Sequence, residues 1–195
     1  MQGLDRQVMK WPPLLVFIAT SLDGFIARPD GGIDWLFHQP PPDPPEDHGY
    51  DAFVSRVDTL VMGRGSFEKV MTFEQWPYAG LRVIVLSRTL GELPADFRDK
   101  AELHRGSLEE LRTKVQGSKG VYVDGGQVIQ SFLRLGLIDE MTVTRLPVLL
   151  GSGLPLFGPL TGDQQSADQW WQHQDTRVFA GSGMVQSTYR RAGTA

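Results

Sequence analysis

The sequence predicts an α/β fold, with a mostly parallel central sheet, helices on both faces and an antiparallel C-terminal edge hairpin. Short apolar runs alternate with helical stretches along most of the chain. The last two apolar runs follow one another with no helix between them, which is typical of a hairpin. A length of 195 residues with 41% apolar residues suits one globular core. We therefore expect a single domain over residues 1–195, with its core at about 14–190 and tails at 1–13 and 191–195.

The strands of this sheet are predicted from apolar, β-branched runs bounded by turn residues. Five such runs are Leu14–Thr20, Thr59–Met62, Arg82–Leu86, Val121–Asp124 and Glu140–Leu146. Two more, near Gln172–Phe179 and Met184–Tyr189, would pair as the hairpin, with the turn at residues 180–183.

Helices are expected between the strands. Ser107 and Glu110 have the spacing of a capping box, and Leu108, Leu111 and Val115 follow at helical intervals. The other helix predictions are Gln127–Leu135 with an apolar face and Gly136 as its stop, and the shorter Asp51–Val57 and Ser66–Met71.

The N-terminal and proline-rich segments are given structural interpretations. Arg6 and Lys10 precede the apolar run Leu14–Ala19, but Ser21–Gly24 ends that run, so a buried first strand is favoured over an export signal. No stretch approaches the roughly 18–20 apolar residues of a membrane span. We expect a cytoplasmic protein with no membrane partner. The prolines of residues 40–45 exclude a helix or central strand and predict a surface loop.

Composition excludes several function classes. A net charge of −4 argues against a nucleic-acid partner, which would require a basic surface. The absence of cysteine excludes disulfides, zinc–thiolate sites and thiol nucleophiles. The four histidines have no metal-ligand spacing, and no phosphate-loop, zinc-helix or nucleophile-elbow motif is present. We therefore predict no metal site.

Glycines, a serine and an arginine at strand ends favour nucleotide binding. Gly63–Ser66 and Asp124–Gln127 each lie between a strand and a helix, where glycine lets the backbone approach an anion. Ser87 and Arg88 end another strand, and a guanidinium there suits a 2′-phosphate. Each segment alone fits an ordinary turn equally well. Together, at one edge of an open sheet, they favour a nucleotide site.

A set of ordered motifs resembles the dihydrofolate reductase superfamily, and within it the riboflavin-biosynthesis reductase, the C-terminal domain of a bifunctional deaminase-reductase. The first motifs are Ser21–Ala27, Asp34–Leu36, Val61–Arg64 and Val85–Arg88. Those closer to the riboflavin branch are Val123–Gln127, Gly136–Glu140 and Pro147–Phe157. The resemblance covers about residues 14–190.

The resemblance implies the same fold, NADPH as cofactor, and site residues at matching positions. Residues implied to bind the cofactor are Ala19, Ile26, Ala27, Gly63, Arg64, Gly65, Ser66, Ser87, Arg88, Gly125, Gly126, Gln127 and Val128. Those assigned to the substrate are Asp34, Trp35, Asp51 and Thr144, although Trp35 also fits a core aromatic and Thr144 an ordinary strand residue. No catalytic residue is assigned; Asp34, Asp47 and Asp51 are candidate proton donors.

Two departures from the family pattern restrict the activity. The carboxylate that holds the pterin in dihydrofolate reductases falls near Gly49, with Asp47 and Asp51 displaced to either side, so folate reduction is not favoured. The deaminase half of the bifunctional enzyme needs cysteine ligands for zinc, so we expect no deamination.

The resulting interpretation is an NADPH-dependent reductase of a small substrate, resembling 5-amino-6-(5-phosphoribosylamino)uracil reductase. Three alternatives stay open: a non-catalytic NADP(H)-binding module, a folate reductase, and an interaction protein that uses the proline-rich loop and Trp170–Trp171. A homodimer is expected from the resemblance and from apolar residues of the C-terminal hairpin, namely Trp170, Trp171, Val178, Phe179 and Met184.

Overall fold

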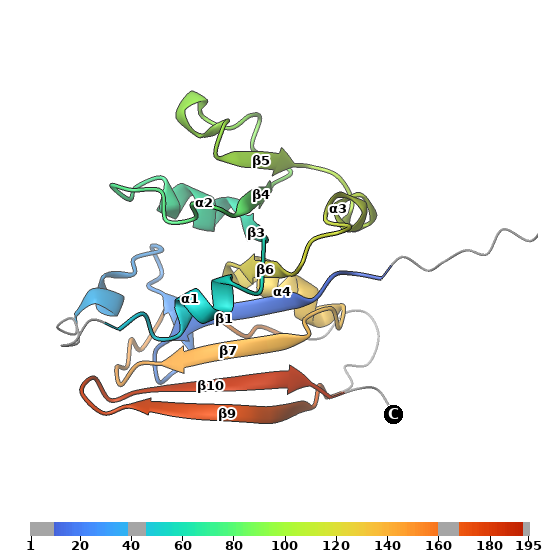
Figure 1. Ribbon diagram of the computed structural model, residues 1–195. Helices are drawn as coiled ribbons and strands as arrows, with labels where there is room; N and C mark the ends of the chain where they lie inside the picture. Colours follow the sequence, from blue (N-terminus) through green and yellow to red (C-terminus); the bar gives the residue numbers. More distant parts are fainter. Residues whose placement is uncertain (1–9, 39–45, 160–167, 193–195) are drawn as a thin grey trace, which may run out of the picture.

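The computed structural model describes residues 10–38, 46–159 and 168–192 (Figure 1). An eight-stranded sheet has the order β5-β4-β3-β6-β1-β7-β10-β9, from β5 at the top of Figure 1 to β9 at the bottom. The predicted strands are confirmed to within two residues at each end. They are β1 (Leu14–Thr20), β3 (Thr59–Gly63), β4 (Arg82–Leu86), β6 (Val121–Asp124), β7 (Glu140–Arg145), β9 (Trp171–Phe179) and β10 (Met184–Arg191).

The sheet is parallel from β5 to β7 and antiparallel only at β10 and β9. The four predicted helices all form and are α1 (Tyr50–Val54), α2 (Arg64–Val70), α3 (Leu108–Lys114) and α4 (Gly126–Arg134). This mostly parallel sheet with an antiparallel C-terminal edge confirms the predicted fold class.

Apolar side chains pack on both faces of the sheet in separate clusters. One cluster joins Phe53 of α1 and Phe67 of α2 to strand residues such as Leu15. The other joins Leu111 of α3 and Phe132 of α4 to the opposite side chains of the same strands. Because neighbouring residues of a strand face opposite sides, both faces of the parallel strands are covered.

Local signals fix two of the helix ends as predicted. Ser107 Oγ accepts a hydrogen bond from Glu110 N–H, and the Glu110 carboxylate accepts one from Ser107 N–H. This reciprocal pair begins α3. Gly136 follows α4 with φ +62°, the left-handed conformation that favours glycine after a helix.

Three short strands and two 3-10 turns were not predicted. Strand β5 (Ala101–His104) extends the sheet beyond β4, while β2 (Phe25–Ala27) and β8 (Leu154–Pro155) form a separate two-stranded sheet. The two turns are η1 (Asp34–Phe37) and η2 (Ala95–Phe97). The predicted proline loop, Arg6 and parts of both predicted tails lie outside the described residues.

Candidate functional site

The predicted glycine turns meet at the carboxyl edge of the sheet. Strands β3 and β6 are hydrogen-bonded neighbours, with Met62 opposite Asp124, so the turns that follow them lie together. A β-carbon placed on Gly125 would overlap Ser66 Oγ, and one on Gly63 would lie 3.2 Å from Val128 Cγ2. Gly125 also has φ +86° and ψ 131°, a conformation that only glycine adopts readily. Gly125 is therefore required by close approach and by conformation, while Gly63 is favoured by close approach alone.

The segment at Ile26 and Ala27 lies against the same turns. A β-carbon on Gly126 would lie 2.8 Å from Ile26 Cδ1. Strand β2, which carries both residues, pairs with β8, so that Ala27 is opposite Leu154. The small sheet thus brings residues near 26 beside the start of α4, about 100 residues later in the chain.

Asp23 holds this small sheet in place, a role that sequence reasoning did not assign. Its carboxylate accepts hydrogen bonds from Ser21 Oγ at 2.6 Å and from the N–H groups of Leu150 and Gly151 at 3.2 and 2.8 Å. The Ser21 hydroxyl is the main cause that lowers the pKa of Asp23. Two motifs of the sequence, Ser21–Ala27 and Pro147–Phe157, therefore form one structural unit.

The residues expected at a 2′-phosphate lie around the turn after β4. Arg64 donates a hydrogen bond to Thr89 Oγ1 at 3.2 Å and pairs with Glu68. Ser87 Oγ accepts hydrogen bonds from Thr89 and Leu90 N–H, which fixes the turn. Arg88 is exposed, and in the described part of the chain it makes no ion pair. Its guanidinium is available to an anion.

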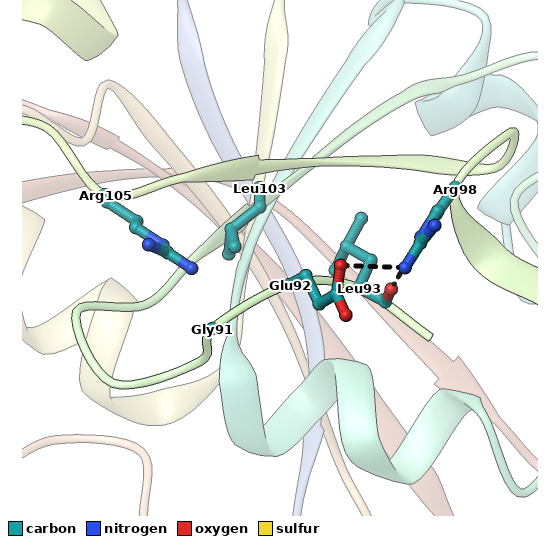
Figure 2. A pocket seen from close by; sticks show the side chains of 6 residues that line it. All are labelled: Gly91, Glu92, Leu93, Arg98, Leu103 and Arg105. Carbon is teal, nitrogen blue, oxygen red and sulfur yellow. Dashed lines mark hydrogen bonds and ion pairs between the residues drawn. The ribbon is translucent and has the colours of Figure 1, made fainter. Parts of the chain in front are cut away.

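A cavity of about 450 Å³ continues from this turn toward β5 (Figure 2). On one side Arg98 is held by Glu92 and by the carbonyl oxygen of Leu93, while Arg105 lies on the other side near Gly91. None of its lining residues is among the predicted site residues, which lie at other positions along the sheet edge.

Ala19 and Thr144 form part of a row across three strands. Ala19 of β1 is opposite Thr144 of β7, and Thr144 is opposite Gln186 of β10. Thr144 is buried, and its hydroxyl accepts a hydrogen bond from Gln186 Nε2 at 2.8 Å. Phe17 and Ala19 are only half-buried although β1 lies inside the sheet. The carboxyl half of β1 is therefore accessible.

Trp35 lies close to this row but is a core residue. It is 4% exposed and packs with Leu146, Phe179 and Met184, with Ala19 at the edge of the cluster. Within the described residues its indole Nε1–H has no hydrogen-bond partner. The burial of Phe179 and Met184 here corrects the expectation that both contribute to an apolar patch for dimerisation, because their side chains turn inward onto Trp35.

The three aspartates considered as proton donors are on the surface. The Arg28 guanidinium, paired with Asp34 at 2.7 Å, holds the pKa of that carboxyl below its usual range. Hydrogen bonds from the N–H groups of Asp51 and Gly49 lower the pKa of Asp47. Asp51 is exposed in the first turn of α1. The structure does not bring Asp34 or Asp51 into contact with the other predicted substrate residues.

Asp124, at the end of β6, is an acidic group on the carboxyl edge of the sheet that differs from the three surface aspartates. Burial raises the pKa of Asp124, against hydrogen bonds from Gly125 N–H and Ser66 that lower it. Burial is also the main cause that raises the pKa values of Tyr50, Tyr78 and Tyr122, and the charge of Asp124 adds to each. The three phenols therefore stay protonated near neutral pH, and Tyr122 O–H donates a hydrogen bond to the carbonyl oxygen of Phe17 at 2.9 Å. Asp124 stands in a predicted motif, but no pattern in the sequence pointed to the tyrosines.

Gly65 and Gln127, the remaining predicted cofactor residues, are exposed near the starts of α2 and α4. Within residues 10–38, 46–159 and 168–192, no cluster of three or more histidine or acidic side chains is placed to hold a metal ion. Among the helices of those same ranges, none has the length and apolar character needed to cross a membrane.

Comparison with known proteins finds a family model that covers most of this chain. The family model of the RibD C-terminal domain matches residues 12–182. An uncharacterized Bacillus subtilis protein, YwjB, is 33% identical over 154 residues, covering 76% of this chain and 84% of its own length.

Two solved structures are similar over nearly the whole chain. A putative riboflavin biosynthesis protein from Shewanella sp. PV-4 has 41% identity and a TM-score of 0.82, covering 92% of this chain and 99% of that one. Dihydrofolate reductase from Enterococcus faecalis, complexed with NADP(H) and RAB-propyl, has 18% identity and a TM-score of 0.63, covering 93% and 98%. The latter likeness shows the shared fold.

Proposed function

We propose that this chain, which belongs to the RibD C-terminal domain family, is an NADPH-dependent reductase of a small pyrimidine. The observation that carries the proposal is the carboxyl edge of the sheet. There, three segments far apart in sequence meet at glycines whose β-carbons would collide with neighbouring side chains. Such crevices at the carboxyl ends of parallel strands are where open α/β sheets bind ligands.

The residues present fit a dinucleotide. Gly63, Gly125 and Gly126 let these turns pack tightly on one another, which brings the starts of α2 and α4 close together, and a helix N-terminus favours an anion such as a pyrophosphate. Arg88 and Ser87 would hold the 2′-phosphate, for which a guanidinium is suited because it can form two parallel hydrogen bonds. The other proposed cofactor residues are Ala19, Ile26, Ala27, Arg64, Gly65, Ser66, Gln127 and Val128. When bound, NADPH supplies the hydride.

The substrate is proposed to lie over the accessible half of β1. Thr144, Trp35 and the helix α1 border this region, and the half-buried Tyr50 begins that helix. We retain Asp34 and Asp51 only as possible contacts at the rim, because both are exposed. The site's own residues orient the ring and exclude water.

A proton must accompany the hydride, and the structure favours Asp124 over the surface aspartates as its source. The pKa of Asp34 and of Asp47 is lowered, so both carboxyls are deprotonated near neutral pH. Burial raises the pKa of Asp124, which favours its protonated form.

The test is steady-state oxidation of NADPH with 5-amino-6-(5-phosphoribosylamino)uracil and, separately, with dihydrofolate. We expect turnover of the pyrimidine and little or none of dihydrofolate. Saturable NADPH binding without oxidation by any pyrimidine or pterin would instead favour a non-catalytic module. Dihydrofolate turnover that is abolished by Asp47→Asn or Asp51→Asn would favour a folate reductase.

We further propose that the protein acts as a homodimer in the cytoplasm and has no nucleic-acid partner. Of the five apolar residues considered for dimerisation, Trp170 and Val178 remain 75% and 64% exposed at the open edge of the sheet. Their apolar area would be covered by a second copy.

A further inference from the structure

A second cavity, of about 420 Å³, lies at the amino end of the central strands, away from the carboxyl edge. Leu15 and Glu140 line it and are opposite each other where β1 and β7 begin. At the other end of the same two strands Ala19 is opposite Thr144, so the length of the strands separates the cavity from the proposed substrate region. A volume of this size is typical of pockets that hold small molecules.

A buried carboxylate anchors two guanidinium groups at this cavity. The Glu140 side chain is 7% exposed and accepts hydrogen bonds from Arg56 Nη1 at 2.6 Å and from Arg190 Nη2 at 3.3 Å. Burial raises the pKa of Glu140, but the hydrogen bonds from Arg56 and then Arg190 outweigh burial and hold the pKa below its usual value. The carboxylate is therefore charged near neutral pH and keeps both arginines beside the cavity.

Both guanidinium groups have donors left for a ligand. A guanidinium carries five N–H donors, and among the described residues the side chains of Arg56 and Arg190 donate to Glu140 alone. Both arginines are exposed, and both line the cavity. The cavity therefore offers two guanidinium groups that are held in place but not saturated.

The ion pairs around the cavity leave one positive charge without a partner. Asp139 also lines the cavity, and its carboxylate accepts a hydrogen bond from Leu14 N–H at 2.9 Å and lies 3.9 Å from the Arg191 guanidinium. Asp139 and Arg191 therefore balance each other, whereas Glu140 can balance only one of its two arginines. The remaining charge favours a ligand with a single negative charge, and a carboxylate matches the planar fork of a guanidinium.

Apolar side chains form the rest of the lining. They are Trp11, Pro13 and Leu15. Trp11 is half-buried, and its ring packs edge-on against Phe132 with the two centroids 5.7 Å apart, which fixes its position. An indole ring and a proline ring beside guanidinium groups favour a ligand whose body is flat and apolar, whereas a small inorganic anion would make no use of them.

We propose that this cavity binds an aromatic carboxylate, with the carboxylate on Arg56 and Arg190 and the aromatic ring against Trp11 and Pro13. Glu140 acts as the residue that positions the two arginines. The site is separate from the carboxyl edge of the sheet, and it does not depend on the proposed reductase activity.

The experiment compares the dissociation constants of 2-naphthoate and of its neutral analogue 2-naphthamide, measured by calorimetry. The wild type binds the naphthoate at least about tenfold more tightly, as expected for one charge-assisted hydrogen bond. Arg190→Gln removes most of this preference, while Arg56 remains to pair with Glu140. Arg134→Gln, the same change at an exposed arginine of α4, keeps the wild-type preference.

A second measurement locates the ligand in the wild-type protein. The indole N–H resonance of Trp11, identified as the signal that is lost in Trp11→Phe, shifts when 2-naphthoate is added, and saturating NADPH does not reverse the shift. If thermal unfolding shows that Arg190→Gln does not fold, these wild-type measurements decide.

Four results would each overturn the proposal. They are an absence of naphthoate binding or equal affinity for the two probes in the wild type, an unchanged preference in folded Arg190→Gln, an unmoved Trp11 resonance, and displacement of the naphthoate by NADPH. Inorganic phosphate serves as the bare anion, and phosphate that binds as tightly as the naphthoate would also contradict a site for an aromatic carboxylate.

Discussion

Replacing Gly153 with alanine should open the small β2–β8 sheet and weaken cofactor binding. A β-carbon at this position would approach the carbonyl oxygen of Ala27 to less than 3.0 Å, and would lie 3.0 and 3.1 Å from Phe25 Cγ and Cβ. The obstructing atom belongs to the backbone, so no change of rotamer can relieve the overlap. The strand that carries Ala27 must move, and with it Ile26.

The size of the effect follows from these contacts. Inserting one methyl group into a fully packed position costs about 1–3 kcal/mol. Gly151→Ala is the matched control: Gly151 has φ +73° but nothing within 4 Å of its β-carbon. That substitution should cost about 1–2 kcal/mol of backbone strain and leave the strands paired.

We therefore expect Gly153→Ala and Gly151→Ala to differ more in their affinity for NADPH than in their free energy of unfolding. Urea unfolding gives the free energy of unfolding, and fluorescence titration gives the dissociation constant of NADPH. We expect Gly153→Ala to bind NADPH at least about tenfold more weakly, equivalent to some 1.4 kcal/mol, and Gly151→Ala to bind it normally. Equal affinity in the two variants would refute the reasoning, because it would show that the position of Ile26 and Ala27 does not matter to the cofactor.

Three further outcomes are expected. Arg88→Ala should weaken the binding of NADPH by about ten- to a hundredfold and leave the affinity for NADH unchanged. Titration measures both affinities, and Arg134→Ala, which changes another exposed arginine, is the control. Hydrogen bonds from Arg82, and then from Lys114, lower the pKa of Glu102 from 4.5 to about 2, so its stabilisation is complete above about pH 4.5 and is lost as pH falls toward 2. Urea unfolding between pH 4.5 and 2 measures how the free energy of unfolding depends on pH. Glu102→Gln should reduce the loss of that free energy over this range by about 1 kcal/mol or less, because the Arg82–Glu102 pair is partly exposed. The same loss in Glu102→Gln and wild type would contradict this. Light scattering should give twice the 21.7 kDa of one chain, and Trp170→Asp should give the monomer.

Strands β1, β3, β4 and β6 could be predicted because apolar residues dominate each of these short runs. Strand β5 could not, since Glu102 and His104 alternate with only two apolar residues at the edge of the sheet. Strands β2 and β8 have three and two residues, and Pro155 argues against a strand. Their pairing depends on tertiary contacts, above all those of Asp23.

The meeting of the strand-to-helix turns after β3 and β6 could be predicted, because sheet topology alone brings such turns together. Hydrogen bonds and ion pairs between side chains of distant segments could not be predicted. Nothing in the sequence indicates that Gln186 bonds to Thr144 and His48, or that Asp34 is engaged by Arg28. The sequence allows Trp35 to be a core or a substrate residue, and the structure places it in the core, where its N–H has no partner among the described residues.

The position of β1 inside the sheet has a consequence for synthesis of the chain. Among the described residues its neighbours in the sheet are β6 and β7, with Leu14 opposite Val121 and Leu15 opposite Glu140. On the ribosome, β1 must wait for about 100 further residues before either partner strand is made. Until then an apolar strand with two open edges is exposed to other nascent chains. We therefore expect the segment Leu14–Ala19 to be a binding site for chaperones during synthesis.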